Sequence, residues 1–174
     1  MNKKIIVVII GFLWVAISAG MIISKQHTLR TGKTVVLETV PVDPRDFLRG
    51  DYVVLRYKLS SLDLNQIESD KPYYRPGENI YVKLKPKGKY WEAADISGKK
   101  EAVADGTFLK GKVRDYDLKT RKLEAAYGIE SYFVPEGEGK VIVKNMRGNK
   151  SSVSVEVLVD SSGSALIKKV YIEM

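Results

Sequence analysis

The chain of 174 residues contains no cysteine and a single histidine, His27. The absence of cysteine excludes a disulfide framework, a thiol nucleophile and every thiolate-ligated metal site. One imidazole is too few for a histidine-rich metal site, and the sequence has neither a phosphate-cradling glycine loop nor a dinucleotide fingerprint. The sequence therefore predicts no cofactor and no metal site, so any chemistry would use oxygen, amine or guanidinium groups.

Basic residues outnumber acidic residues by 29 to 21, which gives a formal net charge of +8. The densest basic runs are "KLKPKGK" at 83–89 and "KTRK" at 119–122, and acidic residues interrupt most of the others. This spread favours solvated strand edges and loops, where lysine prevents strands from aggregating. Attraction to anionic lipid headgroups is the next interpretation. No nucleic-acid partner is expected, because no recognised binding module accompanies the charge.

One long apolar run, "IIVVIIGFLWVAISAGMII" at residues 5–23, carries no charge. As a helix it would span about 28 Å, which is enough to cross the hydrocarbon core of a bilayer. A cleaved signal peptide is the alternative, because "MNKK" is a basic leader and the small residues at 16–19 resemble a cleavage site. The apolar run continues past that site to Ile23, so the sequence favours an uncleaved signal anchor.

The anchor divides the chain into four expected segments. They are a cytoplasmic tail (1–4), a transmembrane signal anchor in the lipid bilayer (5–23), a juxtamembrane linker (24–32) and an extracytoplasmic β-domain (33–174). Basic residues on the two sides of the span nearly balance, but a four-residue tail is a minimal cytoplasmic flank and a large domain can translocate despite its charges. We therefore expect a single-pass protein of the bacterial inner membrane with its C-terminal domain outside the cytoplasm.

Short strands with turn signals between them fill the rest of the chain. The expected strands are 33–40, 52–59, 79–84, 90–96, 107–116, 123–133 and a closing hairpin of 153–159 with 166–172. Strand 52–59 alternates, with Val53, Leu55, Tyr57 and Leu59 on one face. The segment 136–148 is compatible with a strand or with a short helix near 136–147. The predicted fold class is mainly β, an antiparallel sandwich or small barrel preceded by one N-terminal transmembrane helix.

The stretch "PVDPRDFLRGDYVVLRYKLS" at 41–60 concentrates turn residues and charge. Pro41 and Pro44 end the preceding strand, and Gly50 permits a backbone angle that a Cβ would forbid. The remaining charge exceeds what one turn needs, and arginine is suited to bidentate contacts. We expect a binding surface, called here the binding ridge, that comprises Arg45, Asp46, Arg49, Asp51, Tyr52 and Arg56, together with Glu130.

Within this stretch, "GDYVVLRY" places Gly50, Asp51, Tyr52, Leu55 and Tyr57 in the spacing Gly-Asp-Tyr-x-x-Leu-x-Tyr. This motif and the later "YGIESYFVPEG" at 127–137 resemble the bacterial GDYXXLXY protein family. The resemblance implies a membrane-anchored protein, and because family members occur beside or fused to multi-spanning membrane proteins, it implies such a partner. Residues expected to have a structural role in the motif and its flanks are Pro41, Pro44, Gly50, Leu55, Tyr57, Tyr127 and Gly128.

The sequence favours a non-enzymatic domain that is an interaction or accessory subunit of a multi-spanning membrane protein. The alternative is a hydrolase or ligand-binding module with a layout similar to that of signal peptidases, which use a serine nucleophile and a lysine base. Pro41 occupies the position where that nucleophile would lie, and Lys58 is expected on the solvent face, where an amine stays protonated. No catalytic residue is therefore assigned.

Overall fold

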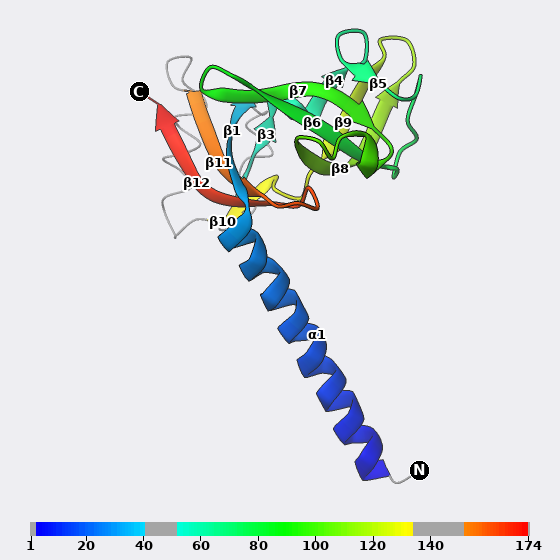
Figure 1. Ribbon diagram of the computed structural model, residues 1–174, viewed down its shortest axis with the longest axis vertical. Coiled ribbons are helices and arrows are strands. Elements are labelled where there is room, and N and C mark those ends of the chain that lie inside the picture. The colour runs from blue at the N-terminus through cyan, green and yellow to red at the C-terminus, as the bar shows by residue number, and fades with distance from the viewer. Residues whose placement is uncertain (1–2, 41–51, 134–151, 174) are drawn as a thin grey trace.

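The structure is a computed structural model that describes residues 3–40, 52–133 and 152–173. One long helix, α1 (Lys3–Thr31), projects from the β-strands that make up the rest of the molecule (Figure 1). Its apolar side chains are exposed, because no other described part of the chain covers them. The helix includes the apolar segment 5–23 and continues through the segment expected as a linker to Thr31.

A four-stranded antiparallel sheet follows the helix. In spatial order it consists of β12 (Ala165–Glu173), β11 (Ser152–Val159), β1 (Lys33–Val40) and β3 (Arg56–Tyr57). Alternate residues of β1 are buried, among them Val35 and Leu37, whereas β11 is buried almost throughout, with Ser154 and Leu158 covered on the face opposite its valines. The strand predicted at 33–40 and the closing hairpin are confirmed, since their period-two valines line the face of the sheet that is directed to the core.

A second sheet has six strands. In spatial order they are β4 (Ser61–Asp63), β9 (Lys122–Ala126), β8 (Thr107–Asp117), β6 (Asn79–Lys87), β7 (Tyr90–Ser97) and β5 (Glu68–Ser69). Among the strands that the structure describes, only β5 and β7 pair in parallel, and a 3-10 helix η2 (Lys100–Ala102) lies between β7 and β8 in the chain. The strands predicted within β6, β7 and β8 are confirmed. The sequence did not predict β4 and β5, which are too short to show a periodic pattern.

Two strands that the sequence predicted as continuous are interrupted. The segment 52–59 forms β2 (Tyr52–Val54), β3 and a 3-10 helix η1 (Lys58–Ser60), although its predicted inner face is buried as expected. The segment 123–133 breaks into β9 and β10 (Ser131–Phe133) because the backbone turns at Gly128, where φ is +79°. β10 then pairs antiparallel with β2.

The sheets enclose one hydrophobic core. It receives side chains from both larger sheets, and β1 lies against β7 where these sheets approach each other (Figure 1). The mainly β class with one N-terminal apolar helix is confirmed. The described strands form open, mainly antiparallel sheets and do not close into the small barrel that was one of the two predicted architectures. The segment 136–148, expected as a strand or a short helix, lies outside the described residues.

Candidate functional site

The motif residues Leu55 and Tyr57 point into the core and are 1% and 0% exposed. The Leu55 amide donates a hydrogen bond to the Glu130 carbonyl oxygen at 2.8 Å. The Tyr57 hydroxyl donates to the Ile129 carbonyl oxygen at 2.6 Å, and the Tyr127 hydroxyl donates to the Leu59 carbonyl oxygen at 2.7 Å. The segments 55–59 and 127–130 are thus joined in both directions, because each contributes a buried tyrosine hydroxyl that donates to a backbone carbonyl of the other.

Burial, and secondarily the negative charge of Glu130, raises the pKa of the Tyr57 and Tyr127 hydroxyls far above the ordinary value for tyrosine. Both phenols therefore remain protonated donors throughout the physiological pH range. They hold the chain between β9 and β10 against the chain from Leu55 to Leu59. We call this set of residues, Leu55, Tyr57, Leu59, Tyr127, Ile129 and Glu130, the tyrosine clamp.

Glu130, predicted as a binding residue, belongs to this clamp. Its carboxylate accepts hydrogen bonds from the Tyr127 amide at 2.5 Å and from the Gly128 amide at 3.0 Å. A carboxylate that caps its own turn satisfies amides that the left-handed residue Gly128 exposes. Leu55, Tyr57 and Tyr127, for which structural roles were predicted, are therefore buried members of the tyrosine clamp, and Glu130 supports the same turn.

Of the other residues predicted for the binding ridge, the structure describes only Tyr52 and Arg56. Arg56 is exposed on β3, where its guanidinium donates to the Glu124 carboxylate at 2.9 Å. Tyr52 forms part of β2, with its backbone opposite Phe133. The rest of the ridge lies outside the described residues, as do three residues of the structural motif: Arg45, Asp46, Arg49, Asp51, Pro41, Pro44 and Gly50. The binding ridge therefore stays a prediction.

Lys58, the lysine considered as a general base, points to solvent, and its side chain is 56% exposed. Its ammonium lies 3.2 Å from the Glu38 carboxylate and 3.6 Å from the Glu92 carboxylate. The hydrogen bond and charge of Glu38, with a smaller contribution from Glu92, raise the pKa of Lys58 above its usual value. A general base needs the opposite shift, so this lysine is suited to ion pairing and not to proton abstraction.

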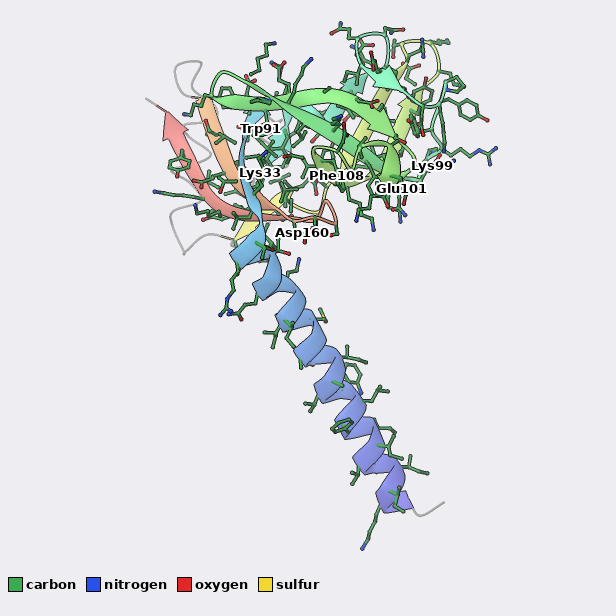
Figure 2. All side chains as sticks on the ribbon, in the orientation of Figure 1. Lys33, Trp91, Lys99, Glu101, Phe108 and Asp160 are labelled. Atoms are coloured by element: carbon green, nitrogen blue, oxygen red, sulfur yellow. The ribbon has the colours of Figure 1, made fainter. Side chains whose placement is uncertain are left out.

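A groove of about 420 Å³ opens beside Lys58, where β1, η1 and β4 meet β6 and β7. Trp91, Ile67 and three smaller apolar residues supply apolar surface, and three lysines and three carboxylates lie among them. The Lys33 ammonium lies 4.9 Å from the centre of the Trp91 ring, and both side chains are labelled in Figure 2. Tryptophan is enriched at protein–protein interfaces, so the half-buried Trp91 makes this groove a candidate binding surface.

Helix α1 is joined to the sheets by more than its peptide link. Thr28 is 3% exposed, and its hydroxyl donates to the Asp160 carboxylate at 2.7 Å. The same carboxylate accepts hydrogen bonds from the Ser162 and Ser164 amides in the turn between β11 and β12. Figure 2 shows Asp160 where the helix meets the sheets. Sequence reasoning missed this joint because its two partners are far apart in the chain.

The family model for the GDYXXLXY protein matches residues 14–170, which is nearly the whole chain. The chain belongs to the GDYXXLXY family. The comparison with curated proteins and the comparison with solved structures each return no match. Leu55 and Tyr57, two of the residues that give the GDYXXLXY family its name, are thus members of the tyrosine clamp. The family membership and the apolar helix together fit a membrane-anchored domain.

Replacing Thr28 with valine should loosen the joint between α1 and the sheets. The hydroxyl is lost at nearly constant volume, and the partly buried Asp160 carboxylate loses a donor, so we expect the free energy of unfolding to fall by about 1 kcal/mol. A spin label on α1 and one on β8 should give a broader distance distribution in the variant than in the wild type. Since the chain has no cysteine, both labels can be attached to introduced cysteines.

Asp160 also predicts how the joint responds to acid. Partial burial opposes ionisation of Asp160, but hydrogen bonds from Ser162, Thr28 and Ser164 outweigh it and hold its pKa below the ordinary value. The stability from this group is present above the ordinary carboxyl pKa of about 3.9 and is lost as the pH falls through the lower folded-state pKa. The distance distribution of the wild type should therefore broaden in acid, whereas Asp160→Asn should remove this response. An equally acid-sensitive Asp160→Asn variant would contradict the assignment.

Proposed function

We propose that this protein is a single-pass, membrane-anchored subunit whose β-domain lies outside the cytoplasm of a bacterial cell and binds a multi-spanning membrane protein. The observation that carries the proposal is the exposed apolar surface of α1. The helix is long and apolar enough to cross a membrane, and its side chains have no cover from the described residues. Such a surface requires lipid or the helices of a partner around it.

The joint at Thr28 supports an uncleaved anchor. The helix passes without interruption from the apolar run to Thr31, and β1 begins at Lys33 after the single residue Gly32. Cleavage near Ala19 would separate most of the apolar run from the part of the helix that Thr28 fixes to Asp160. Because the helix is continuous and is fixed to the domain, a movement of its membrane-spanning part would be transmitted to the sheets.

The groove at Trp91 is the surface that we propose for the partner's extracytoplasmic loop. Tryptophan is enriched among residues that dominate binding energy, and the alternating charges of Glu38, Lys58, Lys87 and Glu92 would select a loop with both signs of charge. Since Lys58 is held protonated by two carboxylates, binding is better supported than hydrolysis at this position.

Site-specific photo-crosslinking in cells tests the partner. A photoreactive residue at Lys87, on the rim of the groove, should capture one multi-spanning membrane protein, identified by mass spectrometry. The same residue at Lys119, an exposed turn position away from the groove, is the matched control. Trp91→Ala should reduce the Lys87 crosslink at least tenfold, the loss expected from removing an interface anchor worth about 1.4 kcal/mol or more. Equal crosslinks from Lys87 and Lys119 would contradict the proposal.

The anchor and its orientation are tested separately. The wild-type protein should remain in the membrane fraction after alkaline carbonate extraction. In intact cells, Lys119→Cys should react with a membrane-impermeant maleimide, and the cysteine-free wild type provides the background. Extraction by carbonate would exclude the anchor, whereas labelling only after cell lysis would place the domain in the cytoplasm.

A further inference from the structure

A second cleft, of about 310 Å³, lies where α1 reaches the sheets. Its walls include Lys25 from α1, Lys110 and Lys112 from β8, and Asn79 from β6. Lys110 and Lys112 are two residues apart on one strand, so they point to the same face, and all three lysines are exposed. We propose that this cleft, called here the lysine cleft, binds the phosphate of an anionic phospholipid headgroup.

The charge of the lysine cleft is not neutralised within the described part of the chain. Five other lysines are paired with carboxylates within 4.0 Å: Lys58, Lys71, Lys83, Lys87 and Lys168. None of the described salt bridges includes Lys25, Lys110 or Lys112, and no carboxylate is among the residues that line the cleft. Three ammonium groups without a carboxylate around one concavity make a site for an anion.

Four carboxylates close along the chain to the lining residues are already engaged. Glu78 pairs with Lys71, and Glu124 pairs with Arg56. Glu130 accepts hydrogen bonds from the Tyr127 and Gly128 amides. Asp160 accepts hydrogen bonds from Thr28 and from the turn that leads to Ser164. None of these carboxylates forms a described salt bridge with Lys25, Lys110 or Lys112, so the cleft keeps an excess of positive charge.

The position of the cleft along α1 selects the source of the phosphate. Lys25 follows the last apolar residue of the run, Ile23, by two residues, a rise of about 3 Å. Each headgroup layer of a bilayer is roughly 5–8 Å thick, so the cleft lies at headgroup depth when α1 spans the membrane. Basic groups at this depth attract anionic lipids. This step rests on the proposed membrane anchoring.

Native mass spectrometry of the full-length protein tests the site. In detergent micelles containing equal amounts of phosphatidylglycerol and phosphatidylcholine, the wild type should retain phosphatidylglycerol in preference. Lys110→Gln combined with Lys112→Gln should lower the affinity for phosphatidylglycerol about fivefold for each lysine removed. Lys119→Gln combined with Lys122→Gln changes the charge equally at the other end of β8, away from the cleft, and should keep the wild-type retention. Circular dichroism checks that both variants remain folded.

The outcomes separate three possibilities. An unchanged bound fraction in Lys110→Gln/Lys112→Gln, or an equal loss in Lys119→Gln/Lys122→Gln, would overturn the site. Displacement of phosphatidylglycerol by millimolar inorganic phosphate at constant ionic strength would overturn the lipid assignment and indicate a site for free phosphate. Loss of the wild type from carbonate-washed membranes would show that the anchoring itself fails. If only the lysine cleft is wrong, the wild type should stay in the carbonate-washed membranes, and Lys110→Gln/Lys112→Gln should retain as much phosphatidylglycerol as the wild type.

Discussion

Replacing Tyr57 with alanine is expected to lower the free energy of unfolding of the full chain by about 3–5 kcal/mol. The side chain is fully buried in the core between the sheets, so its removal leaves a cavity among the surrounding core side chains. The variant also leaves the Ile129 carbonyl oxygen without the phenol that donates to it. Urea unfolding in detergent micelles, followed by circular dichroism, measures the loss.

Tyr57→Phe isolates the hydrogen bond from the packing. The ring stays in place, but the buried Ile129 carbonyl loses its donor, which should cost about 1–3 kcal/mol. Tyr116→Phe is the matched control, because the Tyr116 hydroxyl also donates to a backbone carbonyl, that of Pro72, at an exposed position where water can replace it. If both phenylalanine variants lose the same amount, the clamp is not desolvated and this account of the motif is wrong.

The tyrosine clamp explains what two of the motif residues do. Leu55 and Tyr57 alternate onto the buried face, where Leu55 fills the core and Tyr57 reaches the backbone near Gly128. Both therefore specify how the segment before β10 is fixed against the end of β3. Leu55 and Tyr57 are therefore occupied in the core, and of the predicted ridge, Arg56 is paired with Glu124 on the surface.

The strands were predictable where alternation is long enough to define a face. β1 and the β11–β12 hairpin follow from period-two valines, and the inward face of 52–59 was predicted although the strand itself is interrupted. The interruption near Gly128 could not be read from alternation, because it depends on a positive φ that Glu130 stabilises from two residues away. Local pattern fixes the face of a residue, whereas its partners depend on tertiary contacts.

The candidate sites show the same limit. Lys58 could be placed on the solvent face from its position in the strand, and the structure confirms this placement. Its two carboxylate partners come from β1 and β7, which the topology brings together from distant parts of the sequence. The lysine cleft and the joint at Thr28 also combine residues from α1 with residues from β8 or the β11–β12 turn. Neither could be predicted without the pairing of the sheets.

Gly163, in the turn between β11 and β12, connects the two larger sheets. β9 ends at Ala126, which pairs with Lys112 of β8. β9 therefore offers no carbonyl oxygen to the amide that lies two residues earlier in β8. That amide, of Lys110, donates instead to the Gly163 carbonyl at 2.8 Å. Gly163 has a φ of +82° and is packed so closely that an added Cβ would lie 2.6 Å from the Phe108 ring and 2.8 Å from the Lys110 nitrogen.

Gly163→Ala is therefore expected to lower the free energy of unfolding by roughly 2–5 kcal/mol. The left-handed backbone costs a residue with a Cβ about 1–2 kcal/mol, and forcing a methyl group against β8 costs about 1–3 kcal/mol more. Urea unfolding of the full chain measures the total. Gly77→Ala is the matched control, since Gly77 has a φ of +87° and nothing within 4 Å of an added Cβ.

The difference between the two alanine variants reports the contact between the sheets without the backbone strain that they share. A larger loss at Gly163 than at Gly77 would support direct packing of the β11–β12 turn on β8, as would faster hydrogen exchange of the Lys110 amide in Gly163→Ala alone. Equal losses would mean that the turn can move away from β8 at no cost. In that case β8 and the turn that holds Asp160 would not be one rigid support for α1.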